Sequence, residues 1–347
     1  MDLLKEFEDI VDNDYSSIVS DGIVGDNYEF IDTGSYMLNA LISGSINGGF
    51  PSNKVTAFAG ESSVGKTYYL LQAIIGFFTK YPKGRLVFFE SESALTKAMF
   101  EERGIPTKQI LFLPVETIQE FRTQALRILN KYEDTPVKKR PPLMLALDSL
   151  GNLSTKKEVE DIAEGSDKRD MTRSQLIRGS FRALTLKMGK VNVPLILTNH
   201  TYTTVGSFIA QQEVSGGGGL KYAASSIITF TKAQDKVKTD VVGGIITAYM
   251  YKSRITREKK KVKTQLSFQN GLNPWYGLLE FGEEHGIFSK SGNKWLMGEK
   301  KLYEKAIYKD PEQHFTPEIM EQLDKAAKRT FPFGSAVADE NVEVEAS

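Results

Sequence analysis

One short stretch of the chain has the residue types and the spacing of a phosphate-binding loop. GESSVGKT, Gly60–Thr67, follows the apolar run KVTAFA and precedes the helical run YYLLQAIIGFF. In that setting the N–H groups of the loop and of the helix N-terminus can surround phosphate oxygens. The Lys66 ammonium can reach the outer phosphates, and the Thr67 hydroxyl can take a magnesium position. The predicted nucleotide-binding residues are Gly60, Glu61, Ser62, Ser63, Val64, Gly65, Lys66, Thr67 and Tyr68; the alternative is a chance glycine-rich turn.

A nucleotide hydrolase also needs carboxylates beside the metal ion and the attacking water. The apolar run LMLALDS carries Asp148 to the end of a predicted strand, where the ligand sites of α/β sheets lie. Asp148 and Thr67 are therefore the predicted magnesium ligands. The run RLVFFESES offers Glu90 and Glu92 as the second carboxylate, and spacing does not choose between them. Both could instead cap a helix in SESALTKAMF, because Ser and Glu are favoured at helix N-termini.

The elements that must position these residues are short apolar runs rich in β-forming residues. KVTAFAG, GRLVFFE, PLMLALDS and VPLILTNH are continuously hydrophobic, as strands buried on both faces of a parallel sheet are. Helical stretches such as TIQEFRTQALRILNKY lie between them, which predicts a doubly wound α/β sheet. After Ser225, the runs SSIITFTK, GGIITAYMYKSR and KTQLSF predict antiparallel strands added at one edge of that sheet.

The composition is that of a soluble protein with a sizeable core. The chain has 347 residues, of which 40% are hydrophobic and 25% charged, with a formal net charge of +0. A basic footprint for nucleic acid must therefore be local. The absence of cysteine and the presence of only three histidines argue against thiolate chemistry and histidine-based zinc sites. We expect a cytoplasmic protein without a membrane partner, because no run has the roughly 18 apolar residues of a membrane span and the N-terminus is acidic.

Together these motifs resemble the RecA family of strand-exchange recombinases, most closely its T-even phage UvsX-type branch. The resemblance runs from about Phe30 to Trp295 and rests on IDTGSYMLNALISGSINGGFPSNKVTAFAGESSVGKT, VFFESES, LALDSLGNLSTKKE, DMTRS, NHTY, GGGGLKYAAS, YKSR and NPWYGLLEFG. It implies a RecA-like ATPase core that uses ATP and Mg²⁺. It also implies a helical filament of this chain on single-stranded DNA that pairs with homologous duplex DNA in recombination, repair and recombination-dependent replication. A loading mediator and a single-strand-binding protein are the further implied partners, in the host cytoplasm if the chain is phage-encoded.

The resemblance also assigns roles to individual residues. It implies that Glu92, not Glu90, activates the attacking water. Lys252 and Arg254 in YKSR would reach the phosphates of a neighbouring subunit, and Tyr276 would stack on the adenine. The chain departs from the bacterial proteins at His200, where they carry a glutamine that senses the γ-phosphate. The His200 ring could donate a hydrogen bond to phosphate; the alternative is that it only packs at a strand end.

Two segments after strand ends are the candidate DNA-binding loops. Residues 152–173 are polar and carry several basic residues among acidic ones, whereas residues 202–219 are almost uncharged, glycine-rich and contain aromatic residues. Cations beside apolar side chains suit single-stranded DNA, although ordinary solvated loops are the alternative. The predicted DNA-binding residues are Lys156, Lys157, Lys168, Arg169, Arg173, Tyr202, Phe208, Gly216, Gly217, Gly218 and Gly219. The lysines between Lys259 and Lys263 form either a secondary duplex site or a solvated hairpin end.

The predicted organisation has three parts. Residues 1–29 are an N-terminal oligomerisation segment that docks on the adjacent subunit, 30–280 are the ATPase and DNA-binding core, and 281–347 are a small C-terminal region. That region ends in the acidic tail ADENVEVEAS. Two other classes of protein share parts of this pattern. A ring helicase has the same ATPase core, and a phosphotransferase also holds ATP in a loop such as Gly60–Thr67.

Overall fold

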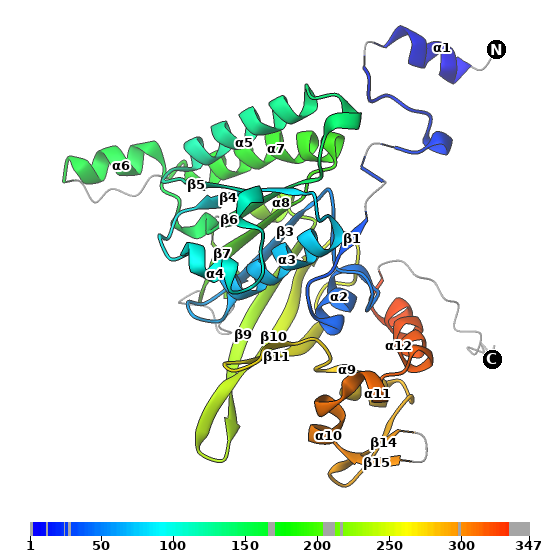
Figure 1. The fold of residues 1–347 in the computed structure, drawn as a ribbon. Coiled ribbons are helices and arrows are strands. Elements are labelled where there is room, and N and C mark those ends of the chain that lie inside the picture. The colour runs from blue at the N-terminus through cyan, green and yellow to red at the C-terminus, as the bar shows by residue number, and fades with distance from the viewer. Residues whose placement is uncertain are drawn as a thin grey trace, which may run out of the picture.

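A mostly parallel β-sheet forms the centre of the molecule (Figure 1). The computed structural model describes residues 3–11, 13–23, 25–26, 29–165, 171–203, 212–215, 218–297 and 300–332. The order of strands across the sheet is β12-β11-β10-β9-β3-β7-β6-β4-β5, and β8 pairs with β7. The strands are β3 Val55–Gly60, β4 Arg85–Glu90, β5 Ile110–Pro114, β6 Leu143–Asp148, β7 Leu195–Thr203, β8 Gln212–Val214, β9 Ser226–Val237, β10 Asp240–Ser253, β11 Lys261–Ser267 and β12 Gly271–Asn273. The predicted α/β sheet with antiparallel strands at one edge is confirmed.

One strand runs in the direction opposite to the prediction. Strand β9 pairs in parallel with β3, from Thr56 opposite Ser226 to Gly60 opposite Phe230, and only β10, β11 and β12 are antiparallel additions. The physical reason is the helix α8, Gly218–Ala223, which precedes β9. A helical crossover returns the chain to the edge where β3 begins, so the next strand is parallel. The edge strand β5, ILFLP, is an element that the sequence analysis did not single out.

Helices cover both faces of the sheet, which explains why its strands are continuously hydrophobic. Helices α5 Ile118–Glu133, α7 Arg173–Val191 and α8 pack on one face, and α2 Tyr36–Ser43, α3 Lys66–Lys80 and α4 Lys97–Glu101 lie on the other (Figure 1). Alternate residues of one strand enter different cores. Phe88 belongs to the core under α3, whereas Val87 and Phe89 belong to the core under α5 and α7.

Local signals in the sequence fix where these helices begin and end. Helix α5 begins after Thr117, whose hydroxyl oxygen accepts a hydrogen bond from the N–H of Glu120 at 3.2 Å. Helix α7 ends at Asn192, which has a left-handed φ of 56°. Helix α6, Lys156–Ala163, lies inside the first predicted DNA loop and begins with a capping box of Thr155 and Glu158. It projects from the body (Figure 1), so that part of the predicted loop is a helix.

The two ends of the chain form the remaining elements. Helix α1 Leu3–Ile10 stands apart from the body (Figure 1), and β1 Phe30–Ile31 pairs with β2 Phe50–Pro51. The C-terminal region contains α9 Leu278–Glu284, the strands β13 Ser289–Ser291, β14 Lys294–Met297 and β15 Lys300–Tyr303, and the helices α10 Glu304–Lys309, α11 Pro311–His314 and α12 Pro317–Thr330. Short 3₁₀ helices are η1 Val19–Asp21, η2 Thr107–Gln109, η3 Val137–Lys139 and η4 Leu150–Asn152. None of the helices described here is long and apolar enough to cross a membrane.

Both end segments contact the core through specific side chains. The carboxylate of Asp324 on α12 accepts hydrogen bonds from the Ser45 hydroxyl and from the N–H of Ile46. The Tyr15 hydroxyl donates to Oε1 of Glu133 at 2.7 Å, and the Lys190 ammonium lies 4.4 Å from the Tyr15 ring centre. The division at residues 29/30 and 280/281 stays a prediction. The acidic tail lies outside the described residues.

Candidate nucleotide-binding site

The phosphate-binding loop connects the carboxyl end of β3 to the first residue of α3. Gly65 has a φ of 107°, in the left-handed region that favours glycine. At Gly60 a Cβ atom would lie 2.8 Å from the carbonyl oxygen of Phe230, so the close approach of β9 excludes a side chain there. Within the part of the chain that the structure describes, no side chain caps α3. The first N–H groups of this helix are therefore available to an anion.

Lys66 is buried beneath this loop. Its Nζ atom donates hydrogen bonds to the carbonyl oxygens of Gly60 at 3.0 Å and Glu61 at 2.8 Å. Burial lowers the pKa of Lys66, while the charges of Glu92 and Asp148 act in the opposite direction. The ammonium therefore binds two carbonyl groups of the loop that is predicted to hold the phosphates.

Asp148 and Thr67 meet at the end of the sheet beside Lys66. The Thr67 hydroxyl donates to Oδ2 of Asp148 at 2.7 Å, and the Thr198 hydroxyl donates to Oδ1. Burial raises the pKa of Asp148, although the hydrogen bonds from Thr198 and Thr67 oppose that effect. A hydroxyl and one carboxylate fit Mg²⁺, which keeps waters and substrate phosphates among its ligands. Among the described residues there is no group of three or more His, Cys, Asp or Glu side chains that would hold a metal without phosphates.

The structure separates Glu90 from Glu92, which spacing did not. Glu90 is 4% exposed, and its Oε1 atom accepts hydrogen bonds from the N–H groups of Glu92 at 2.9 Å and Ala94 at 3.1 Å. The Glu92 side chain is 26% exposed, and its Oε1 atom lies 3.4 Å from Nε2 of His200. Neither carboxylate caps α4, which begins at Lys97. Glu90 therefore shapes the turn, and Glu92 is the carboxylate that faces the site.

Ser91 joins the Glu92 turn to the end of β6. Its hydroxyl donates to the carbonyl oxygen of Ser149 at 2.9 Å and accepts from the Ser149 N–H at 2.9 Å. The Ser91 N–H donates to the carbonyl oxygen of Asp148 at 2.8 Å. These bonds hold the two carboxylates, Glu92 and Asp148, on adjacent turns. Neither Ser91 nor Thr198 is among the predicted site residues, because a lone serine or threonine carries no chemical signature of its own.

His200 lies where the nucleotide site meets the second predicted DNA loop. In the parallel register of β3 and β7 it is opposite Gly60. Its N–H donates to Oδ1 of Asn199 at 2.9 Å, and Nδ2 of Asn199 donates to the carbonyl oxygen of Ser215 at 2.7 Å. The Ser215 N–H in turn donates to the carbonyl oxygen of His200 at 2.8 Å. A movement of the chain near Ser215 would therefore act directly on His200.

The predicted DNA-binding residues occupy different environments. Lys156 and Lys157 are exposed on α6, and Tyr202 is 48% exposed on β7. Gly218 begins α8, and Gly219 is buried there, where a Cβ would lie 2.8 Å from the backbone nitrogen of Arg178. Arg173 is half-buried and donates hydrogen bonds to backbone carbonyl groups. Lys168, Arg169, Phe208, Gly216 and Gly217 lie outside the described residues. The DNA contacts of this set stay a prediction.

Lys252 and Arg254 lie toward the end of the sheet opposite to the end that carries the phosphate-binding loop. Lys252 pairs with Ile227 of β9, which is opposite Ala57 of β3, three residues before Gly60. At about 3.3 Å per residue, the loop is about 10 Å further along the sheet. Lys252 donates to the carbonyl oxygen of Ala224, directly after α8, and Arg254 donates to that of Tyr222 within α8. Burial and the charge of Arg254 lower the pKa of Lys252 to about 8.

Tyr68 and Tyr276, both predicted to bind the nucleotide, are held by neighbouring groups of the protein. The Tyr68 hydroxyl accepts hydrogen bonds from Nε2 of Gln72 and from the N–H of Leu272, each at 3.1 Å, and the Arg103 guanidinium lies 5.6 Å from its ring centre. The Tyr276 ring stacks on Tyr308 with the ring centres 6.1 Å apart. Burial, with the charge of Glu280, raises the pKa of Tyr276 to about 12. Its contact with adenine stays a prediction.

Comparison with known proteins identifies the family of this chain. The family model of the RecA N-terminal domain matches residues 15–273. The recombination and repair protein of Enterobacteria phage T4 is 31% identical over 263 residues, which are 76% of this chain and 66% of the T4 protein. Protein RecA of Desulforapulum autotrophicum is 26% identical over 319 residues, covering 90% of this chain and 86% of that protein. Protein RecA of Paenarthrobacter aurescens is 25% identical over 321 residues, with the same two shares. The motif resemblance and the RecA fold are thereby confirmed, and the chain belongs to the RecA family.

Proposed function

We propose that this chain is an ATP-dependent recombinase that forms filaments on single-stranded DNA and catalyses homologous pairing and strand exchange. In this function it is a DNA-dependent ATPase of recombination and repair. The observation that carries the proposal is the convergence of Lys66, Thr67, Asp148, Glu92 and His200 at one edge of the sheet. That group provides a cation for the phosphates, two oxygen ligands for Mg²⁺ and a candidate general base, in a chain of the RecA family.

Each residue has a defined part in hydrolysis. Thr67 and Asp148 would hold Mg²⁺, which supplies positive charge to the β- and γ-phosphates of bound ATP. Lys66 exchanges its loop carbonyls for phosphate oxygens. The Glu92 carboxylate would accept a proton from a water molecule while the oxygen of that water bonds to the γ-phosphorus. The bond between the γ-phosphorus and the ADP oxygen breaks in the same step. The His200 ring, beside Glu92, would donate a hydrogen bond to the γ-phosphate. Its hydrogen bonds with Asn199 and Ser215 would couple the position of Ser215 to the presence of that phosphate.

A filament would add the cations of a neighbouring subunit to the Lys66 ammonium of the loop. Because Lys252 and Arg254 lie about 10 Å along the sheet from their own phosphate-binding loop, we assign them to the nucleotide of a neighbouring subunit. ATP between subunits would then strengthen the interface, and hydrolysis would weaken it and release DNA. Lys252 and Arg254 bind carbonyl groups at the end of α8, and α8 follows the segment around Ser215 in the chain. We therefore expect a change at this interface to move that segment.

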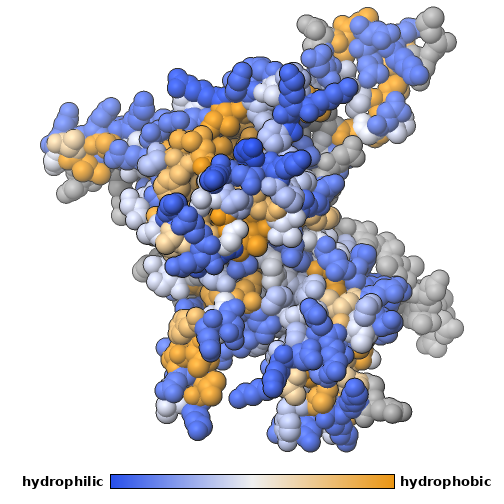
Figure 2. All heavy atoms as spheres, viewed as in Figure 1, coloured by the Kyte–Doolittle hydropathy of each residue, from blue (hydrophilic) through white to orange (hydrophobic). Residues whose placement is uncertain are grey.

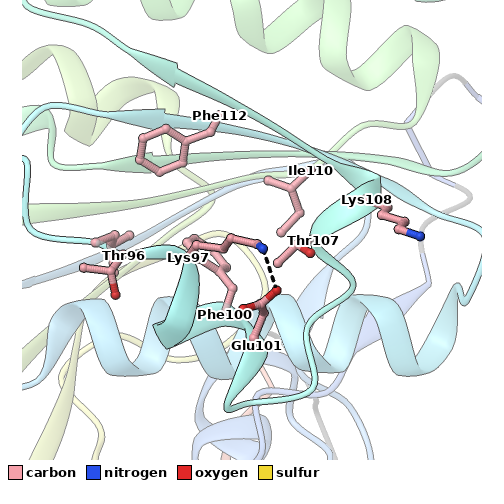
Figure 3. A pocket seen from close by; sticks show the side chains of 9 residues that line it. Thr96, Lys97, Phe100, Glu101, Thr107, Lys108, Ile110 and Phe112 are labelled. Carbon is pink, nitrogen blue, oxygen red and sulfur yellow. Dashed lines mark ion pairs between the residues drawn. The ribbon is translucent and has the colours of Figure 1, made fainter.

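The N-terminal arm and the sheet edge offer complementary surfaces for self-assembly. Helix α1 exposes Leu3, Phe7 and Ile10, which a solvated helix would not favour. The edge strand β5 exposes Leu111 and Phe112, and Figure 2 shows apolar side chains gathered over this edge. A hollow of about 520 Å³ lies between β5 and α4, with Ile110, Phe112 and Phe100 on its walls (Figure 3). We propose that α1 of one subunit docks at this edge of the next.

DNA would follow the exposed cations of α6 and the segment after β7. Lys156 and Lys157 take phosphates, and Tyr202 offers an exposed ring to a base. Lys259, at a turn with a φ of 65°, and Lys261 are exposed at the start of β11 and suit a secondary duplex site. A solvated hairpin end remains the alternative for these lysines. The resemblance supports a loading mediator and a single-strand-binding protein as partners in the host cytoplasm.

One pair of assays tests this function against its competitors. We expect ATP hydrolysis to rise when single-stranded DNA is added and electron micrographs to show helical filaments that need ATP. Unwinding of a forked duplex without filaments would instead support a ring helicase. Transfer of phosphate to a small acceptor, independent of DNA, would support a phosphotransferase. Either result would overturn the proposed function.

A further inference from the structure

We propose that Gly151 and Arg173 are positioning residues that together hold the His200 ring against Glu92. The proposal rests on the proposed function in one respect, because it takes His200 and Glu92 as the pair that faces the γ-phosphate. It gives Arg173 a task inside the protein instead of the DNA contact that its place in the sequence suggests. The observations that carry it are the spacing around Gly151 and the hydrogen bonds of Arg173.

The His200 ring rests on the backbone of Gly151 in η4. A Cβ atom at Gly151 would lie 2.6 Å from Cδ2 of His200, 3.1 Å from Oδ1 of Asn199 and 3.4 Å from Cγ of His200. Gly151 is not among the glycines with a left-handed φ, so its backbone would accept any residue. What requires glycine there is therefore the space that the His200 ring occupies. Since that ring can rotate about its side-chain bonds, a larger residue would displace the ring and spare the fold.

Arg173 holds the same turn from the start of α7. Its Nη2 atom donates hydrogen bonds to the carbonyl oxygen of Gly151 at 2.8 Å and to that of Leu150 at 3.4 Å. The Arg173 side chain is half-buried, and its Nε atom is fully buried. Bonds from a charged donor are stronger than those between neutral groups. Arg173 therefore fixes the position of the η4 backbone, against which the His200 ring packs.

The other described cations of the first predicted DNA loop differ from Arg173. Lys156 and Lys157 are exposed on α6, where they can meet a phosphate without breaking an internal bond. Arg173 would have to leave two carbonyl groups to do so. The described part of this loop thus contains cations of two kinds, and Lys156 and Lys157 are the exposed ones that can follow a DNA backbone.

The distance between His200 and Glu92 makes their pairing sensitive to this support. Nε2 of His200 lies 3.4 Å from Oε1 of Glu92, already at the long end of hydrogen-bond range. A ring displaced by a further 1 Å or so would lose the contact, and misplacement of that size in an active site can cost about a hundredfold in rate. Loss of either support should therefore lower turnover more than ATP binding.

Nuclear magnetic resonance of the histidine rings tests the proposal directly. The chain has three histidines, His200, His285 and His314, so the ring C–H signals of the full-length protein can be assigned by single substitutions. We expect Gly151→Ala, Arg173→Ala and Glu92→Gln each to shift the His200 signals in samples free of DNA and nucleotide. The signals of His285 and His314 should not move. Arg173→Lys should restore part of the change, because an ammonium can still donate to one carbonyl.

Two matched variants separate positioning from the general effect of each substitution. Gly189→Ala is a glycine-to-alanine change as well, but Gly189 lies on α7 and nothing lies within 4 Å of its Cβ position. Arg182→Ala removes an exposed arginine from the same helix. Both should leave the His200 signals and the ATPase unchanged. Gly151→Ala and Arg173→Ala should lower kcat about tenfold or more, with KM for ATP within about twofold.

The outcomes distinguish this proposal from the proposed function. If Arg173→Ala leaves the His200 signals in place and weakens only DNA binding, Arg173 is a DNA contact and the proposal is overturned. If Gly151→Ala does not fold, the Arg173 series decides by the same criterion. If the His200 signals shift while kcat is unaltered, the positioning is upheld and the role of His200 in hydrolysis is refuted.

Discussion

At the scale of single residues, the two neighbouring glutamates provide the sharpest test of the chemistry. Glu92→Gln keeps the shape of the side chain and removes its basicity, so we expect ATP binding and filaments to persist while turnover falls about a hundredfold or more. Glu90→Gln keeps an oxygen for the N–H groups of Glu92 and Ala94. It should leave turnover within a few-fold and lower stability by about 1 kcal/mol, because its hydrogen bonds become neutral. Steady-state kinetics with the reverse pattern would exchange the two assignments.

Lys252 gives the site a predictable pH dependence. Its pKa in the free subunit is lowered from 10.5 to about 8, whereas a neighbour's phosphates favour the charged form. Assembly with ATP should therefore take up protons above about pH 8, and KM for ATP should rise with pH in that range. Stability of the free subunit should change in the opposite sense. Because the unfolded lysine binds more protons between the two pKa values, the free energy of unfolding should increase with pH there.

Lys252→Arg is the control for this prediction. An arginine stays charged throughout the range, so KM for ATP should become independent of pH while the contact to phosphate is kept. Proton uptake can be measured by calorimetry in buffers of different ionisation enthalpy. A wild-type KM that is flat from pH 8 to the pKa of 10.5 would show that Lys252 does not meet the nucleotide.

The sequence predicted residues whose types and spacing form a chemical pattern, and it missed the supporting contacts that depend on how neighbouring strands pair. Gly60–Thr67 is one contiguous motif between a strand and a helix, so its function follows from the chain itself. Ser91 and Ser149 are 58 residues apart, and only the register of β4 against β6 brings their backbones together. Gly151 and His200 likewise meet only because η4 follows β6, and β6 pairs with β7. No pattern within a short window contains either pairing.

At the scale of elements, α8 joins the end of the second predicted loop to Lys252 and Arg254, the two cations proposed for the interface. Gly219→Ala should disturb it, since the new Cβ would lie 2.8 Å from the backbone nitrogen and 3.1 Å from Cα of Arg178, neither of which can rotate away. Overpacking of this kind costs about 1–3 kcal/mol. We expect urea unfolding to show that loss, and the ATPase to fall as the carbonyl groups holding Lys252 and Arg254 move.

Gly189→Ala is the matched change for this helix packing, because its Cβ position on α7 is open. It should keep or slightly raise stability, as alanine is the better helix former. Equal stability of the Gly219→Ala and Gly189→Ala proteins would contradict the close contact of α8 and α7.

The prediction of elements succeeded where one apolar run made one strand. It failed on the direction of β9, because direction depends on the connection before a strand and the short helix α8 was hidden in the GGGGLKYAAS motif. It also treated residues 152–173 as a loop, although Thr155 and Glu158 form a capping box for α6. A composition rich in charge outweighed that local signal.

At the scale of the whole molecule, the N-terminal arm should matter for assembly and little for folding. Phe7 on α1 is 50% exposed, so Phe7→Glu should change the free energy of unfolding by no more than about 0.5 kcal/mol. The same variant should fail to form filaments, as should Phe112→Glu at the β5 edge. Light scattering with single-stranded DNA and ATP measures the loss. Val137→Glu, at an exposed residue of η3, is the control and should assemble normally.

Normal filaments from Phe7→Glu would remove the arm from the interface. Normal filaments from Phe112→Glu alone would keep the arm and move its docking surface away from β5. Sequence could identify this arm only through the family resemblance, since a short acidic amphipathic stretch has many possible uses. The exposed apolar edge of β5 became visible only when the order of the sheet was known.

The central claim is that each ATP is shared between two subunits, and mixing two inactive variants tests it most directly. On this account Lys66→Ala should damage a subunit's own site, whereas Lys252→Ala/Arg254→Ala should damage the site of its neighbour. Mixed on single-stranded DNA, the two proteins would place some intact phosphate-binding loops against intact trans cations. We predict partial recovery of ATP hydrolysis that depends on DNA and on protein concentration. Mixtures that stay as inactive as the separate variants, while both still coat DNA, would contradict the account.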